Sequence, residues 1–381
     1  MCRNILFVLL LSVIAAAATT RTAAAQVGGA AVVFLQIEPD SRSAGMGNTG
    51  VALSDNSNAI FWNPAGLAYQ KGTEASLTHS NWLPEFNAGL FYEYLTAKHH
   101  VDGIGTFGAH LTYLFLGEHE WRDEQNNFID VFRSYDLAVG ASFGTNVTER
   151  FALGTGIRLI YSNLAPGVNV GGQKTSAGIA TGVDVAGLYR FPQIDAGNMG
   201  IDINLGFNLA NMGPKIQYSD RGQADPIPTN LRFGYAVTLN FDEYNKLTFA
   251  NDFNKMLIRV EPDSINGRRA DPFYKAIFTA WQPISVRSNA QSESEAEMET
   301  LNAFEQMTIG LGLEYWYKDL FALRGGYFYE NPYNGNRKFL TFGSGIRWNI
   351  IGVDFSYIYA LEEHHPLANT MRFSLLLNFL K

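Results

Sequence analysis

The chain of 381 residues contains a single cysteine, Cys2. It lies in a leader that has a basic residue, Arg3, an apolar run over 5–18, and small residues ending in Ala25, the three parts of a secretory signal peptide. Cleavage after Ala25 would leave a mature chain without a thiol, which excludes disulfide bonds and thiol catalysis.

Charge is also scarce, at 17% of residues against about 25% in an average soluble protein. The net charge is -8, and no Lys/Arg cluster is present that could follow a phosphate backbone, so nucleic acid is not an expected partner. Beyond the leader there is no run of about 18 apolar residues, so no transmembrane helix is predicted. If the chain spans a membrane, it must do so as a closed barrel.

Aromatic side chains and period-two alternation are abundant in what remains. Over 231–241, Leu, Phe, Tyr and Val alternate with Arg, Gly, Ala, Thr and Asn, and 371–379 alternates in the same way. Such alternation over about ten residues is typical of a tilted membrane strand with one face in lipid and the other in a polar lumen. Inward charges need partners, so we expect luminal salt bridges and plug contacts at Asp136, Arg158, Asp184, Arg190, Asp202, Arg232, Glu314, Arg324, Arg347, Asp354 and Arg372.

Fourteen segments show this pattern, an even number as single-chain bacterial barrels require. They lie near 73–80, 88–98, 103–117, 131–144, 150–163, 175–190, 199–211, 229–240, 245–255, 305–317, 320–330, 338–348, 352–361 and 369–380. The connections alternate between short turns and mostly longer loops, the longest at 256–304. The sequence therefore predicts an all-β, antiparallel transmembrane β-barrel over 73–381, with both chain ends at the periplasm and the long loops outside.

Residues 26–72, between the leader and the first strand, form a separate segment. From 34 to 69 they do not alternate, and they are rich in glycine and turn formers. Two stretches stand out, DSRSAGMGNTGVA at 40–52 and FWNPAGLA at 61–68. The segment is too short for a domain, and we expect short helices lodged inside the barrel mouth as a plug.

These stretches resemble the FadL-like superfamily of 14-stranded outer-membrane barrels, and within it the PorV (LptO) and PorQ group of the type IX secretion system. The similarity extends to FLQIEPDSRSAGMG at 34–47, SNWLPEF at 80–86 and LTYLFLGEHEWRDEQNN at 111–127, and it spans essentially the whole mature chain. The resemblance implies a luminal plug with structural roles for Asp40, Ser41, Arg42, Gly45, Met46, Gly47, Asn63 and Pro64.

The resemblance also implies a function and a set of partners. A PorV-like protein would be a non-enzymatic outer-membrane carrier surrounded by lipid. It would receive cargo bearing C-terminal signal domains from an SprA-like translocon and pass it to a PorU-like sortase. Two alternatives stay open: a FadL-like transporter of hydrophobic small molecules, and a lipopolysaccharide or lipid A deacylase.

Several short motifs have simpler interpretations than catalysis or ligand binding. Gly45, Gly47 and Gly50 fit G-x-G-x-x-G, but no βαβ unit surrounds them. Gly140–Gly144 fit G-x-S-x-G around Ser142, but a nucleophile elbow needs a strand-to-helix turn, and Ser142 is expected on a strand facing the lumen. The paired histidines at 99–100 and 364–365, residues 118–120 and the acidic run at 292–299 are expected to be solvated loop residues. No catalytic residue, cofactor or metal site is predicted.

Overall fold

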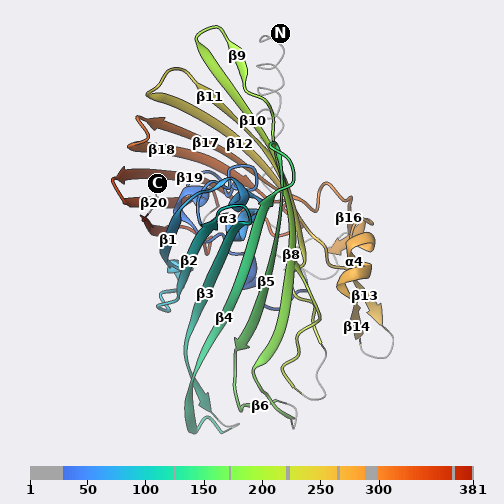
Figure 1. Ribbon diagram of the computed structural model, residues 1–381. Coiled ribbons are helices and arrows are strands. Elements are labelled where there is room, and N and C mark those ends of the chain that lie inside the picture. The colour runs from blue at the N-terminus through green and yellow to red at the C-terminus, as the bar shows by residue number, and fades with distance from the viewer. Residues whose placement is uncertain are drawn as a thin grey trace.

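The computed structural model describes residues 29–122, 125–170, 173–219, 224–263, 267–287, 298–362 and 365–379, and is mostly one antiparallel sheet (Figure 1). Fifteen strands of the described chain form this sheet; the short β9 (Ile194–Ala196) pairs only with β10, and the other fourteen close into a barrel. The fourteen are β1 (Thr73–Asn81), β2 (Phe91–Val101), β3 (Gly105–Arg122), β4 (Phe128–Asn146), β5 (Phe151–Asn163), β8 (Gly178–Arg190), β10 (Met199–Met212), β11 (Asn230–Asn240), β12 (Asn245–Met256), β17 (Thr308–Tyr317), β18 (Phe321–Tyr329), β19 (Lys338–Trp348), β20 (Ile351–Ala360) and β21 (Met371–Asn378).

Each barrel strand pairs with its sequence neighbour, and β1 pairs with β21 to close the ring, for example at Leu77 and Leu375. Closure matters because a bilayer core offers no hydrogen-bond partner to an open strand edge. The predicted barrel and its strand count are confirmed, with boundaries within a few residues of the expected ones. In the described residues, no helix is both long and apolar enough to cross a membrane.

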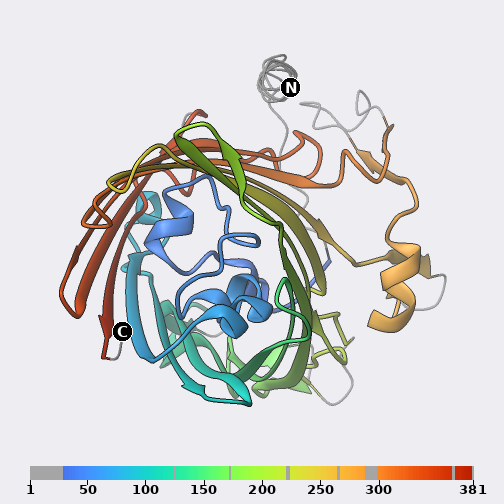
Figure 2. The same cartoon turned by 45° about the horizontal axis from the view of Figure 1, so that its top comes forward.

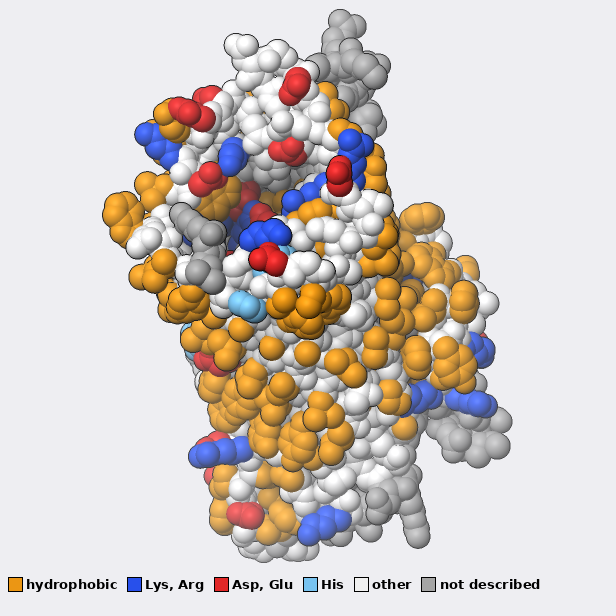
Figure 3. All heavy atoms as spheres, viewed as in Figure 1, with side chains coloured by type: hydrophobic (Ala, Val, Ile, Leu, Met, Phe, Trp, Pro, Cys, Tyr) orange, Lys and Arg blue, Asp and Glu red, His pale blue; other side chains and the backbone are white. Residues whose placement is uncertain are grey.

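The alternation sorts side chains between the two faces of the wall. Ile157 on β5 is 57% exposed and Phe373 on β21 is 51% exposed, whereas their neighbours Arg158 and Arg372 are buried. Figure 3 shows outward residues as a broad apolar surface on the face of the barrel that is in view. That surface is the lipid-facing belt, and the inward face carries the polar and small side chains.

Most of the segment 29–72 lies inside the barrel, as the tilted view in Figure 2 shows. They include η1 (Val33–Gln36), α2 (Ser41–Ala44), α3 (Ala59–Trp62) and η2 (Pro64–Tyr69). At one end, the Ala31 backbone N–H donates to Pro226 O at 3.0 Å, in the long β10–β11 connection. At the other end, Thr106 Oγ1 donates to Gln70 O at 3.1 Å, beside the short β2–β3 turn. The segment therefore runs through the lumen from the outer rim to the periplasmic rim.

This path corrects one expectation. The strand array does begin and end at the rim of short turns, but the first described residues, Gly29–Ala31, lie at the rim of long connections and not at the periplasm. The physical reason is that a segment entering β1 from the periplasmic side can fill the lumen only if its other end lies toward the outer mouth. Alternation within the strands carries no information about that direction.

The connection expected as a loop at 256–304 contains secondary structure of its own. It has two hairpins, β13 (Val260–Asp263) with β14 (Gly267–Ala270) and β15 (Ile284–Arg287) with β16 (Met298–Leu301), and a helix, α4 (Phe273–Thr279). We call the described residues of this connection, 257–263, 267–287 and 298–307, the projection. It lies outside the barrel ring, beside the wall (Figures 1 and 2).

A second outer feature is the β3–β4 ribbon. Beyond Phe115 on β3 and Tyr135 on β4, these strands pair only with each other, because pairing with β2 ends at Phe115 and pairing with β5 ends at Tyr135. The ribbon therefore extends past its neighbours (Figure 1). Val131, 46% exposed, lies on this ribbon.

The lipid-facing assignment predicts opposite outcomes for one substitution at two sites. Ile157→Arg places a charge at mid-span and should lower the free energy of unfolding by about 2–4 kcal/mol. Val131→Arg places the same charge on the ribbon, in water, and should change it by less than about 0.5 kcal/mol. Urea unfolding in lipid vesicles measures both, and equal costs would contradict a membrane belt on this face.

Candidate functional site

The eight residues predicted to have structural roles in the plug all lie within the lumen, on or beside α2 and η2. Seven are buried below 9% exposure and Arg42 is only 12% exposed at its side chain. Ser374 Oγ on β21 accepts from the Ser41 backbone N–H at 3.0 Å and donates to Ser41 Oγ at 2.9 Å. The structure therefore places these eight residues inside the lumen, but not at a single site: Gly45, Met46 and Gly47 lie against β17–β19, and Pro64 lies against β4 and β5.

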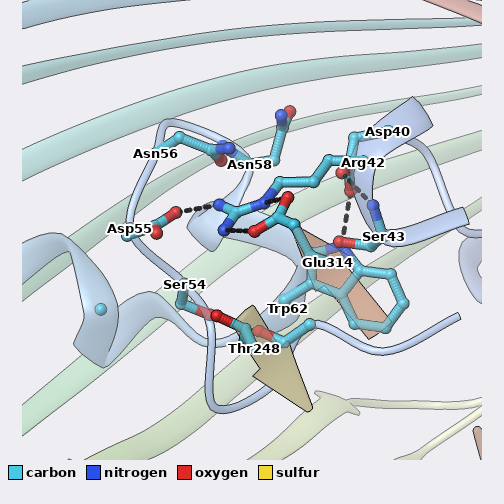
Figure 4. Close-up of polar contacts among 12 residues, drawn as sticks. Asp40, Arg42, Ser43, Ser54, Asp55, Asn56, Asn58, Trp62, Thr248 and Glu314 are labelled. Carbon is cyan, nitrogen blue, oxygen red and sulfur yellow. Dashed lines mark hydrogen bonds and ion pairs between the residues drawn. The ribbon is translucent and has the colours of Figure 1, made fainter. Parts of the chain in front are cut away.

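Asp40 fastens the segment to itself. One carboxylate oxygen accepts from the Ser43 backbone N–H at 2.9 Å and caps α2, and the other accepts from Trp62 Nε1 at 2.6 Å (Figure 4). A capping carboxylate satisfies helix N–H groups that have no other partner. Because Trp62 belongs to α3, this one side chain joins the two halves of the segment.

Arg42 is the second member of a chain of six side chains whose charges alternate in sign. Its guanidinium pairs with Asp55 and, through Nη2, with Glu314 Oε1 at 2.7 Å (Figure 4). Arg324 Nε then pairs with Glu314 at 2.7 Å. The Asp354 carboxylate pairs with Arg324 Nη1 at 2.8 Å and with Arg347 Nη2 at 2.6 Å. The full order is Asp55, Arg42, Glu314, Arg324, Asp354 and Arg347.

The chain links the segment to β17, β18, β19 and β20, and its charges cancel. Burial alone would lower the pKa of the Arg42 guanidinium, but Asp55 and Glu314 more than offset it and raise the pKa well above its ordinary value, so Arg42 stays charged. Glu314 and Arg324 are at most 1% exposed. Removing an interior member leaves an uncompensated buried charge, which is costly.

Gly45, Met46 and Gly47 lie against wall glycines. A Cβ on Gly326 would lie 2.1 Å from Gly47 N, and a Cβ on Gly312 would lie 2.5 Å from Met46 O. Gly47 also has φ +65°, a conformation that favours glycine. These positions let two backbones approach directly, with no side chain between them.

Asn63 and Pro64 repeat this arrangement on the opposite wall. Asn63 Nδ2 donates to Val51 O at 2.8 Å and to Gly187 O at 3.1 Å. A Cβ on Gly144 would lie 2.6 Å from Pro64 O, and one on Gly154 would lie 2.1 Å from Ala65 N. The segment is thus held on both sides of the barrel.

The expected luminal salt bridges are confirmed at Glu314, Arg324, Arg347 and Asp354, and Arg158 pairs with Asp184. Sequence reasoning missed Asp252 on β12, which accepts from the Gly50 and Val51 backbone N–H groups at 2.7 and 2.9 Å. Its inward position between Phe249 and Phe253 was the available signal.

Two cavities lie on either side of the segment. The larger, about 480 Å³, is at the periplasmic end and is lined by charged and amide side chains such as Arg190, Lys246 and Asn349. It forms the hollow with blue and red side chains in Figure 3. The smaller, about 10 Å³, lies toward the outer side among Phe34, Tyr92 and other mostly apolar residues.

Ser142 lies on β4 and is 5% exposed. His110 on β3 also faces the lumen, two positions from the residue that pairs with Ser142. Among the described residues, no hydrogen bond joins these two side chains, and His110 Nδ1 has no partner. The pair therefore lacks the nucleophile-to-base contact that serine catalysis requires.

The histidine and acidic motifs do not converge. His99 contacts Thr73 Oγ1 at 2.7 Å, and His100 contacts Thr106 Oγ1 at 2.9 Å. In the part of the chain that the structure describes, no group of three or more His, Cys, Asp or Glu residues could hold a metal ion. His364 and most of the acidic run at 292–299 lie outside the described residues.

Comparisons with known proteins find one family model and a set of similar folds. A family model described as type IX secretion system protein PorV matches residues 20–263. The fold is similar to the P. putida toluene transporter TodX, at 12% identity and TM-score 0.51, covering 90% of this chain and 99% of that one. A Pseudomonas aeruginosa FadL homologue matches at 11% identity and TM-score 0.45, covering 90% and 98%. A search of curated protein sequences finds no match.

The alternating charge chain predicts unequal effects of two carboxylate-to-amide changes. Glu314→Gln leaves one buried arginine charge uncompensated and should lower the free energy of unfolding by about 3–5 kcal/mol. Asp55→Asn alters the end of the chain, where the side chain is 49% exposed, and should cost less than about 1 kcal/mol. Adding Arg42→Gln to Glu314→Gln restores neutrality and should recover part of the lost free energy of unfolding. Urea unfolding measures the single and double variants. A double variant that loses the sum of the two single losses would refute the coupling.

Adjacent glycines on β18 provide a matched pair for the close backbone contact. Gly326→Ala forces the segment away from the wall, so the N-terminal residues should become sensitive to limited proteolysis. Gly325→Ala should behave as wild type, because the nearest atom to its Cβ is 3.9 Å away. Equal protection of the two variants would show that the approach at Gly326 is unimportant.

Proposed function

The chain belongs to the PorV family of type IX secretion system proteins, and on that basis we propose that it is a non-enzymatic carrier of the outer membrane. It receives exported cargo bearing C-terminal signal domains from an SprA-like translocon and delivers it to a PorU-like sortase. The family match over residues 20–263 is the observation that carries this proposal. We further propose that residues 1–25 are a signal peptide, removed after Ala25.

The filled lumen supports a carrier over a pore. Residues 29–72 act in this proposal as a plug, held by the charge chain, the glycine contacts and Asp252. In the outer half, an apolar cluster that includes Phe34, Phe61, Tyr92 and Ile160 fills the space between plug and wall. A plug fastened in this way leaves the outer surface, rather than a channel, to contact cargo.

The projection supplies a surface for partners. Tyr274 and Phe278 on α4 are 65% and 77% exposed, and Phe304 is 79% exposed. Exposed aromatic side chains are enriched at binding surfaces, where they often contribute most of the binding energy. The projection is fastened to the barrel, since Lys215 Nζ donates to Ala270 O at 2.6 Å, so a partner bound there is held at a fixed place beside the wall.

The structure supports the two alternative functions less well than the carrier function. A hydrocarbon transporter needs an apolar pocket beside the plug, and the cavity beside Phe34 and Tyr92 has a volume of only about 10 Å³. A deacylase built on Ser142 needs a base in contact with it, and His110 makes no such contact. We therefore do not assign transport of small hydrocarbons or catalysis to this chain.

Deletion of the gene tests the proposal in cells that display type IX cargo. Cargo should accumulate inside the cell or lose its surface attachment, and the tagged protein should co-purify with a very large translocon barrel. Clean recovery of the protein alone from a strain with normal cargo display would refute it. A Ser142→Ala variant should support normal cargo display, since no catalytic step is assigned to that serine.

The projection predicts a separable loss of binding. Phe278→Ser removes an exposed aromatic side chain and should reduce co-purification of the secretion machinery about tenfold or more, as expected for a binding hot spot. The barrel should still fold, as judged by heat-modifiable gel migration. Val147→Ser, at an exposed position in a periplasmic turn, is the control and should bind normally; a similar loss in both variants would argue against the projection.

A further inference from the structure

The first residues of the N-terminal segment differ from the rest in how they are held. We call residues 29–37 the strap. Its polar contacts are few: the Ala31 N–H donates to Pro226 O at 3.0 Å, and Gln36 Nε2 donates to Pro228 O at 3.1 Å. Among the described residues the strap makes no ion pair, whereas the following residues are fastened by charges and glycine contacts.

The strap also ends outside the lumen. A Cβ on Gly29 would lie 3.1 Å from Cγ2 of Val260, at the base of the projection. The end of the strap therefore lies at the outer rim, and only its other end continues into the plug. A segment fastened at one end by apolar contacts can leave its place without disturbing Asp40, Arg42 or the wall glycines.

The strap fills a concavity that exists without it. Phe34 and Leu35, 1% and 4% exposed, occupy what we call the outer pocket, whose other walls are Ile60, Phe61, Tyr92, Tyr94, His110, Thr112 and Arg158. With those two side chains in place, about 10 Å³ is left. Moving the strap would open an apolar site inside the barrel mouth.

The walls of the outer pocket hold polar atoms that the strap does not satisfy. Tyr94 Oη, His110 Nδ1 and Arg158 Nε have no hydrogen-bond partner among the described residues, and all three side chains are at most 6% exposed. Buried polar atoms are normally paired, and each unpaired one needs an explanation. A ligand with backbone amide groups could supply both donors and acceptors here.

We propose that the outer pocket is a peptide-binding site and that the strap is its tethered occupant. The ligand is an extended peptide segment with aromatic and aliphatic side chains, which displaces the strap from the outer side. This proposal rests on the proposed function, because it assigns the reception of exported cargo to that pocket. A bound strap lowers the apparent affinity for the peptide by the fraction of time that the pocket is free.

A disulfide that fixes the strap tests the proposal on the full mature chain, which should contain no other thiol. Gly29→Cys with Val260→Cys suits the geometry, because a sulfur in place of Cγ2 lies at bonding range of the partner cysteine. Ser41→Cys with Ser374→Cys is the matched control; these hydroxyl oxygens are 2.9 Å apart in the part of the plug that is not expected to move. Thiol titration verifies both bonds.

The probe is a fluorescent synthetic peptide, VVFLQIE, with the sequence of residues 32–38. The wild type and the Ser41/Ser374 control should bind it, the Gly29/Val260 variant should bind about tenfold more weakly or not at all, and reductant should restore binding. Phe34→Ala loosens the strap and should raise the affinity about tenfold. Equal binding by the locked and wild-type chains would overturn the proposal, as would no binding by any variant including Phe34→Ala.

Two further readouts identify what failed in a negative result. Displacement of the peptide by toluene, with toluene binding retained in the locked variant, would make the pocket a hydrocarbon site and overturn the proposal. Cargo display in cells is scored in parallel. If cargo display depends on this protein but the peptide does not bind, the proposal of a peptide site in the outer pocket is overturned. The proposed carrier function then still stands.

Discussion

A charge on the inner face of a membrane barrel must find its partner inside the lumen, because lipid on the other side of the wall offers none. In this protein the wall and the segment share partners: Asp252 accepts from backbone N–H groups of the N-terminal segment, and Glu314 pairs both with Arg324 of the wall and with Arg42 of the segment. We therefore expect the barrel and the segment inside it to fold together. The sequence of residues 40–64 is constrained by the wall as strictly as by its own helices.

The same constraint explains why glycine is placed where it is. Bulky residues would fill a lumen of this size without a plug, but they could not bring the backbone amides of residues 46–51 within reach of the wall. Glycine at 312, 326, 144 and 154 brings the backbone of the segment into direct contact. Close packing and charge pairing thus depend on each other, since the ion pairs at Arg42 form only at the distance that the glycines permit.

The sequence predicts the barrel well because alternation is a local property and lipid enforces it on every strand. It also identifies Arg42 and Asp40 as residues of an internal segment, through the DSRSAGMG stretch. It does not reveal which wall residue each one meets, since Arg42 and Glu314 are 272 positions apart and their contact depends on strand register. The helix and hairpins at 257–307 and the direction of the strap were missed for a different reason: neither leaves a periodic pattern in the sequence.

The two halves of the lumen therefore differ in how firmly they are closed. The periplasmic half is held by paired charges and by backbone contacts that tolerate no displacement, so opening it would expose several uncompensated charges together. The outer half is closed by apolar side chains of the strap, and apolar contacts can be exchanged for similar ones at little net cost. In the proposed carrier function, this asymmetry allows exchange on the outer side while the contacts of the periplasmic half stay in place.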